Sequence, residues 1–299
     1  MSVMDFRLKV FLSVAQNQSF TKASQELFIT QPAISKHIQE LESAYQTRLF
    51  NRGGKTVTLT FAGKTLHRYA VDIASLYKKA EFEMGLLHEE LVGELRLGAS
   101  TTIAQYILPP ILARFINQFP TVKLSLISGN SYDIENLLKE KQIDLGLIEG
   151  SHRSAEFKYT PFMKDELVAV KSTKNEGLGK DILSLEEFQT TPLVLRERGS
   201  GTLEVLEQAL NKYQIKLSDL NVLMHLGSTE SIKLFLKETD AIAVVSVRSI
   251  YKELYAGNFQ VIDIENLLMN RDFCFVLPHG EEDGLPKKFM GYVLHNEKL

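Results

Sequence analysis

Apolar residues recur at helical spacing in two short segments near the start of the chain, which predicts two helices joined by a tight turn. The first helix is expected over 19–28, with Ser19 as its N-cap. The second follows Thr30, which caps it, and Pro32 fits its first turn because an N–H there would have no helical partner anyway. The buried stripe of the second helix consists of Ile34, Ile38 and Leu41. The pattern is that of a helix-turn-helix.

The opposite face of the second helix is polar. It carries Gln31, Ser35, Lys36 and Gln39. Amide, hydroxyl and ammonium groups near the start of an exposed helix are those that meet base edges and phosphates in a major groove of DNA. The alternative interpretation is an ordinary helical hairpin whose polar face meets only water.

A glycine pair follows the second helix, between two short β-prone segments. Gly53 and Gly54 indicate a hairpin, which would form a wing beside the second helix. Arg52 and Lys55 at its tip are expected to reach phosphates or a minor groove, and the alternative is a tip that is merely solvated.

A long helix is predicted from about Phe61 to Leu91. Its apolar positions, on a roughly seven-residue repeat, are Leu66, Tyr69, Ile73, Leu76, Ala80 and Leu87. Because a small winged domain cannot cover so long a stripe, we expect the helix to pair with a second copy of itself. The alternative is packing against the chain's own second domain.

Beyond Gly93 short apolar strands alternate with helices, which predicts a two-lobed α/β domain with a mainly parallel, doubly wound sheet. The expected strands cover 94–99, 122–128, 144–148, 166–171, 192–195, 221–226, 241–246 and 271–277, with helices over 104–118 and 134–141 and crossovers near 162–166 and 264–270. The expected domains are a winged helix-turn-helix at 1–60, a linker helix at 61–91 and an effector-binding domain at 92–299, with lobe I over about 92–163 and 267–299 and lobe II over about 164–266.

Three strand-to-helix joints carry hydroxyl groups beside free backbone N–H groups. They are Ser100-Thr101-Thr102, Gly199-Ser200-Gly201-Thr202 and Gly227-Ser228-Thr229. The helix dipole favours negative charge at such places, and in a two-lobed open sheet the joints can converge on one cleft. A small organic or inorganic anion is therefore the predicted ligand. The alternative for each joint is plain helix capping, since serine and threonine are common caps.

Charge is distributed unevenly along the chain. The whole chain carries a formal charge of −3, yet residues 1–70 hold nine lysines and arginines against four acidic residues, so the end expected to touch DNA is basic. The composition, 44% hydrophobic and 24% charged, is typical of a soluble globular protein. No apolar run suits a signal peptide or a membrane span, so a cytoplasmic location without membrane contact is expected. Cys274 lies in an apolar run, which predicts a buried strand thiol.

The search for catalytic motifs finds little. The sequence has no His-Glu-x-x-His, no paired cysteines and no complete phosphate-binding loop, and its seven histidines are scattered. We therefore expect no enzyme activity, no metal and no cofactor. Two alternatives remain: a hydrolase using Ser200, and a solute-binding protein, which would explain the second half of the chain but not the helix-turn-helix.

The region from Ser19 to Leu59 resembles the DNA-binding module of the LysR-type transcriptional regulators. The matching segments are Ser19-Phe20-Thr21-Lys22-Ala23, Thr30-Gln31-Pro32-Ala33-Ile34-Ser35, Leu41-Glu42, Leu49-Phe50-Asn51-Arg52 and Leu59-Thr60-Phe61-Ala62-Gly63. The predicted DNA contacts are Thr21, Thr30, Gln31, Pro32, Ser35, Lys36, Gln39, Arg52 and Lys55. The resemblance implies a dimer or tetramer that binds an interrupted inverted repeat of double-stranded DNA and contacts RNA polymerase.

Residues 92–299 resemble the ligand-binding domain of the same family, which is similar in fold to type 2 periplasmic binding proteins. The segment Leu195–Thr202 resembles an effector-cleft loop, with Arg198 in place of the usual proline. Whether Arg198 supplies a positive partner for the anion, or none exists, is left open, and Glu149 would oppose an anion unless it accepts from a donor group of the ligand. The predicted effector-binding residues are Ser100, Thr101, Thr102, Glu149, Arg198, Ser200, Thr202, Ser228, Thr229 and Ser246.

Overall fold

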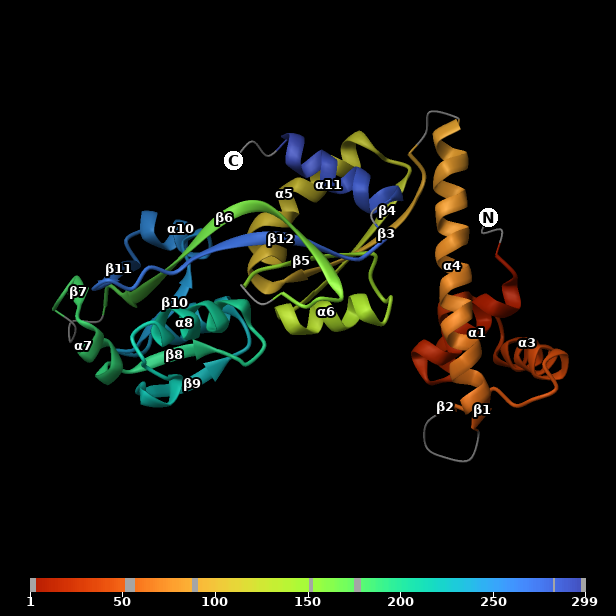
Figure 1. Cartoon of the computed structure of the whole chain (residues 1–299), viewed down its shortest axis with the longest axis horizontal. Helices are drawn as coiled ribbons and strands as arrows, with labels where there is room; N and C mark the ends of the chain where they lie inside the picture. Colours follow the sequence, from red (N-terminus) through yellow and green to blue (C-terminus); the bar gives the residue numbers. More distant parts are fainter. Residues whose placement is uncertain are drawn as a thin grey trace. The chain divides into compact units, whose positions relative to one another are not determined.

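The computed structural model describes residues 4–51, 57–87, 91–150, 153–174, 179–281 and 283–296. They form two compact units, Met1–Val92 and Gly93–Leu299 (Figure 1). We call the first unit, up to the start of its long helix, the head, and the second unit the effector unit. None of the described helices is long and apolar enough to cross a membrane.

The head consists of three short helices and a two-stranded ribbon. The helices are α1 (Phe6–Asn17), α2 (Phe20–Leu27) and α3 (Gln31–Ala44), and the antiparallel strands are β1 (Phe50–Asn51) and β2 (Thr58–Leu59). The Ser19 hydroxyl accepts from the Lys22 amide and the Thr30 hydroxyl from the Ala33 amide, so both expected N-caps of the helix-turn-helix are formed. The core of the head contains the predicted stripe of α3, together with Val10, Phe11, Val14, Ala23, Leu49 and Phe50.

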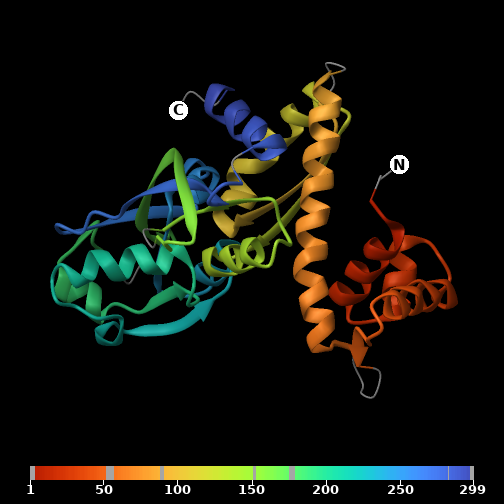
Figure 2. The ribbon, with the colours of Figure 1, turned by 45° about the vertical axis from the view of Figure 1, so that its right-hand side comes forward.

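The long helix α4 (Phe61–Leu87) begins at the predicted residue, and the expected end at Leu91 falls after residues 88–90, which lie outside the described part. Figure 2 shows it as one continuous helix. Only its first turns join the head's core, through Leu66 and the buried Ala70. On another part of its surface, Tyr69, Ile73 and Leu76 of the predicted repeat are exposed, so the described part of the head leaves much of this stripe uncovered.

The effector unit is built on a sheet path whose strand order is β4-β3-β5-β12-β6-β10-β8-β9, with β11 beside β6 and β7 beside β11. The strands are β3 (Gly93–Ser100), β4 (Val122–Gly129), β5 (Leu145–Ile148), β6 (Phe157–Ser172), β7 (Ile182–Leu183), β8 (Leu193–Arg196), β9 (Val222–Leu226), β10 (Ile242–Ser246), β11 (Phe259–Ile264) and β12 (Asn270–Pro278). The helices are α5 (Leu108–Gln118), α6 (Ser131–Lys139), α7 (Leu185–Thr190), α8 (Gly201–Asn211), α9 (Thr229–Leu236), α10 (Val247–Tyr255) and α11 (Gly284–Asn296), with a short 3-10 turn at Leu217–Asp219.

Strand β6 divides the effector unit into two lobes, because its first half pairs with β12 and its second half with β10 and β11. Lobe I holds β3, β4, β5 and most of β12, and lobe II holds β7 to β11. Both views show β6 and β12 running between the lobes (Figure 1, Figure 2). The outer strands are parallel as expected, but β6 and β12 are antiparallel to their neighbours, so the sheet is mixed. The physical reason is that two long strands carry the chain between lobes in opposite directions.

Two further details differ from the sequence-based expectation. The strand expected over 166–171 begins at Phe157, since its first half pairs with β12. The helix expected over 104–118 is divided into a π-helical turn, Ile103–Ile107, and α5, because two prolines at 109–110 lack the N–H groups that would continue a regular ladder. The predicted burial of Cys274 is confirmed.

Candidate functional site

The outward face of α3 carries the residues predicted to contact DNA. Gln31, Pro32, Lys36 and Gln39 are exposed, and Ser35 is half-buried. The Gln31 amide donates to the Ser35 hydroxyl over 3.1 Å, which orients it along the helix surface. A polar edge of this kind can reach the major groove, where amide groups read the edges of bases.

The remaining predicted DNA contacts are Thr30, Thr21, Arg52 and Lys55, which do not lie on the outward face of α3. Thr30 is exposed but its hydroxyl serves as the N-cap of α3, and Thr21 is exposed on α2. Arg52 and Lys55 lie outside the described residues, between the paired strands β1 and β2. The two strands of the expected hairpin are paired, its predicted Gly53-Gly54 turn lies outside the described residues, and the roles of the two basic residues stay predictions.

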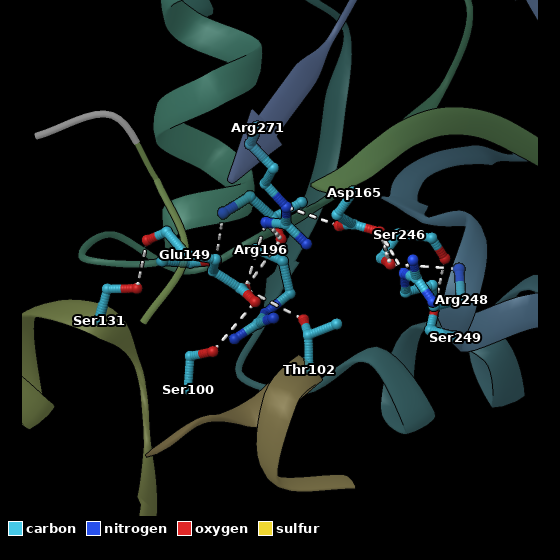
Figure 3. Close-up of polar contacts among 12 residues, drawn as sticks. Ser100, Thr102, Ser131, Glu149, Asp165, Arg196, Ser246, Arg248, Ser249 and Arg271 are labelled. Carbon is cyan, nitrogen blue, oxygen red and sulfur yellow. Dashed lines mark hydrogen bonds and ion pairs between the residues drawn. The ribbon is translucent and has the colours of Figure 1, made fainter. Parts of the chain in front are cut away.

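In the effector unit a buried polar cluster lies between the lobes, centred on Glu149 (Figure 3). The Glu149 carboxylate accepts from Ser100 Oγ, at the end of β3 in lobe I, and from Thr102 Oγ1, just after that strand, each over 3.0 Å. From lobe II it accepts from Thr202 Oγ1 over 3.4 Å, and the guanidinium of Arg271 approaches it to 3.3 Å. Side chains from both lobes thus converge on one carboxylate.

Arg271 links this carboxylate to a second one. Its Nε donates to Asp165 over 2.7 Å, and its Nη1 donates to Thr202 over 3.0 Å. Asp165 also accepts from Ser246 Oγ over 2.7 Å. The side chains of Arg271, Asp165 and Glu149 are 1% exposed or less, so these charges are compensated inside the protein rather than by water.

A second buried cation, Arg196, ends β8. Its guanidinium donates to the Glu197 carboxylate over 2.8 and 3.0 Å and reaches the Gly227 carbonyl at 3.4 Å. Its Nη1 has no hydrogen-bond partner among the described residues, and neither do Arg271 Nη2 and Thr101 Oγ1. Buried polar atoms without partners are costly and rare. Three buried hydrogen-bonding atoms between the lobes therefore lack a partner within the described part of the chain, and a ligand could supply one.

The structure separates the predicted effector residues into two groups. Those in the polar cluster are Ser100, Thr102, Glu149, Thr202 and Ser246, and Thr101 is adjacent. Ser200 and Ser228 are helix N-caps whose hydroxyls accept backbone amides, as the capping alternative predicted, and Thr229 is buried in the first turn of α9. Ser228 is only half-buried and bonds to Ser231.

Arg198 does not supply the buried positive charge, because its side chain is exposed. Arg196 and Arg271 take that place, and the sequence interpretation missed both, together with Asp165. Arg196 was overlooked because the strand was expected to end at Leu195, whereas β8 includes residue 196. The only local signal was a charged residue at the end of an apolar strand.

A further interlobe contact lies beside the cluster. Tyr106, on the π-helical turn of lobe I, donates to Glu230 on α9, and Lys233 pairs with Glu230 over 2.7 Å. Burial, followed by the hydrogen bond to Glu230, raises the pKa of Tyr106 well above its ordinary value, so the phenol stays protonated and can donate. This contact joins the lobes beside the buried cation Lys233.

Chemistry of the hydrolase type finds no support in this geometry. Among the described residues, Ser200 Oγ accepts the Thr202 amide and contacts neither a histidine nor a carboxylate. The described residues also contain no group of three or more potential metal ligands. Without a base to accept the proton of Ser200, nucleophilic attack by its hydroxyl has no assistance.

Two family models match adjoining parts of the chain. The bacterial regulatory helix-turn-helix protein, lysR family, matches residues 6–64, and the LysR substrate binding domain matches residues 88–296. The chain belongs to the LysR family of transcriptional regulators. This LysR-type regulator is also similar to the HTH-type transcriptional regulator CysL of Bacillus subtilis, at 32% identity over 269 residues that cover 90% of this chain and 89% of the relative. Its relatives are regulators, so it is not an enzyme.

Solved structures show the same fold. CbnR, a LysR family transcriptional regulator solved alone and complexed with its target DNA, matches this regulator with a TM-score of 0.65 at 19% identity, over 98% of this chain and 99% of that chain. The regulatory domain of Synechocystis CcmR, solved in complex with 2-PG, matches with a TM-score of 0.62 at 23% identity, over 69% of this chain and 97% of that domain. The winged helix-turn-helix and the two-lobed α/β domain are therefore those of the family.

Proposed function

We propose that this LysR-type regulator controls transcription in response to a small anion bound between the two lobes of the effector unit. The observation that carries this proposal is the presence of two buried guanidinium groups, Arg196 and Arg271, each with a nitrogen lacking a partner among the described residues. Charged donors form strong hydrogen bonds to anionic oxygens, and here they are shielded from water. The complex of the CcmR regulatory domain with 2-PG supports the same class of ligand.

The head is proposed to bind an interrupted inverted repeat of double-stranded DNA through α3, as part of a dimer held by α4. The exposed Tyr69 and Leu76 of α4, at 55% and 64%, support pairing with a second copy, because a helix rarely leaves such a stripe in water. Further association to a tetramer and contact with RNA polymerase belong to this proposal. CbnR has been solved with its target DNA, which supports the DNA-bound state.

The anion would act by preferring one arrangement of subunits. A ligand with equal affinity for two states changes nothing, so the lobes must bind it more tightly in one quaternary state than in another. The contacts that span the lobes, between Glu149 and Thr202 and between Tyr106 and Glu230, are those that a change in lobe position would break or shorten.

The test is a thermal-shift series on the full chain with sulfate, inorganic phosphate and 2-PG, against sodium chloride of equal ionic strength. A ligand that binds only the folded state raises the melting temperature. Thr102→Val removes one hydroxyl of the cluster and is expected to reduce the shift. The matched control is Thr190→Val, on the exposed surface of α7. Equal melting temperatures in all solutions, or equal shifts for both variants and the unsubstituted chain, would contradict the proposed site.

A further inference from the structure

The strongest donors of the interlobe cluster are already taken by a side chain of the protein. The Glu149 carboxylate accepts from the hydroxyls of Ser100, Thr102 and Thr202, and Arg271 adds a charged N–H at 3.3 Å. Hydroxyls and a guanidinium arranged around a buried carboxylate are the surroundings that a protein provides for a bound anion. In this structure the anion is the protein's own.

We propose that Glu149 is an internal competitor of the anionic ligand, occupying as a tethered carboxylate the donors that the ligand takes over when it binds. This inference rests on the proposed function, and it makes Glu149 a residue that sets both affinity and selectivity. It resolves the conflict between an acidic residue at the site and a ligand of the same charge.

The donors cannot satisfy two anions at once. A serine or threonine hydroxyl has a single proton to donate, so Ser100 and Thr102 lose their bonds to Glu149 if they turn to a ligand. The buried cation Arg271 already pairs with both Glu149 and Asp165, and the Arg196 guanidinium already pairs with Glu197. A further negative group therefore brings an uncompensated charge into a buried site unless the Glu149 carboxylate leaves its donors.

When the ligand binds, the side chain of Glu149 moves and its backbone does not, because the backbone is held from two sides. Ser131 Oγ donates to the Glu149 carbonyl over 2.7 Å. Gly201 lies so close that a Cβ built there would come within 2.2 Å of the same carbonyl oxygen, which accounts for a glycine at the start of α8. With the backbone held, rotation of the carboxylate out of the cluster is the motion that frees the donors.

The atoms without partners offer the ligand hydrogen bonds that Glu149 does not use. Arg196 Nη1, Arg271 Nη2 and Thr101 Oγ1 are buried and have no partner among the described residues, so a ligand that bonds to them displaces no existing hydrogen bond there. A simple monocarboxylate offers no more than Glu149 does and lacks its tether. A doubly charged oxyanion with three or more oxygens can satisfy the free donors and the shared ones together. The site thus favours sulfate-like or phosphate-like groups over monocarboxylates.

The experiment is a chemical rescue that needs no knowledge of the natural ligand. Glu149→Ala leaves the hydroxyls around a space of carboxylate size, and acetate is the probe. Acetate is expected to raise the melting temperature of the full-length Glu149→Ala variant but not that of the unsubstituted chain, in which the site is filled. Glu140→Ala, which removes an exposed carboxylate of lobe I, is the matched control and should not respond.

Glu149→Gln provides a second measurement on a variant of unchanged size. Loss of the charge is expected to tighten sulfate binding at least about tenfold, measured by isothermal titration calorimetry, because like charges repel strongly in a buried site. Weaker binding of sulfate by this variant would show that Glu149 recognises the ligand instead of competing with it, which would overturn the inference.

The outcomes separate this inference from the proposed function. If the unsubstituted chain binds sulfate or phosphate but acetate does not stabilise Glu149→Ala and Glu149→Gln binds no tighter, the inference is wrong and the anion site stands. If acetate rescues Glu149→Ala while no anion shifts the unsubstituted chain, the tethered carboxylate is supported and the proposed anionic ligand is not. Circular dichroism of each variant shows whether it is folded.

Discussion

The head and the effector unit use similar polar side chains but assemble them in different ways. On the head, Gln31, Ser35, Lys36 and Gln39 lie on one surface because they belong to a single helix. In the effector unit, Glu149 meets Thr102 and Thr202 from positions 47 and 53 residues away. The first site follows from helical periodicity, whereas the second exists only after the lobes have come together.

Burial changes the meaning of the same residue type between the two regions. On the surface of the head, the Thr30 hydroxyl caps a helix and Thr21 is exposed to water. In the effector unit Ser100 and Thr102 are buried and bonded to a carboxylate. Substituting an exposed polar group lowers the free energy of unfolding little, whereas substituting a buried one leaves its partners desolvated and unpaired. Substitutions on the exposed face of α3 should therefore affect binding, and substitutions in the buried cluster should also affect stability.

The largest expected effect tests whether the effector cluster is held together by its charges. Arg271→Ala removes the buried cation that pairs with both Asp165 and Glu149, and it should lower the free energy of unfolding of the effector unit by about 3–5 kcal/mol. Urea-dependent hydrogen exchange reports the two units separately. Arg248→Ala, which removes a more exposed cation 3.9 Å from Asp165, should cost under about 1 kcal/mol. Equal costs for the two variants would mean that burial does not set the cost of removing a charge from this cluster.

The next effect concerns the head. Gln31→Ala should weaken binding to the operator by about 1–3 kcal/mol and relax base preference, because its amide is placed to reach a base edge, while stability stays unchanged. Fluorescence anisotropy with operator and unrelated duplexes measures both quantities. Gln16→Ala, which removes an exposed amide from α1, should alter neither. A loss of head stability in Gln31→Ala would mean that the exposed face is not purely functional.

The smallest expected effect tests whether Ser228 caps a helix or binds the ligand. Ser228→Ala removes the N-cap of α9, so it should lower the free energy of unfolding of the effector unit by about 1 kcal/mol. The anion-induced thermal shift should remain as in the unsubstituted chain, in contrast to Thr102→Val. If the anion-induced thermal shift disappears in Ser228→Ala, Ser228 binds the ligand, as the sequence predicted.

Much of the head could be predicted because its signals are local. Ser19 and Thr30 mark helix starts, and Ile34, Ile38 and Leu41 mark the buried face of α3 within one helix length. The three joints of the effector unit were also visible, since each is a short run of small and hydroxyl-bearing residues after an apolar strand. Of these, Ser100 and Thr102 enter the cluster, whereas Ser228 does not, and nothing local distinguishes them.

The sequence by itself determined the helix-turn-helix, the two-lobed α/β character and the place of the joints, because periodicity, capping and turn chemistry act over a few residues. Tertiary structure alone decided which charges meet. Arg271 pairs with Asp165 across 106 positions, and Arg196 rather than the nearby Arg198 is buried. Such pairings follow from strand order and the closure of the lobes, and the cost of burying an unpaired charge then holds the chosen partners together.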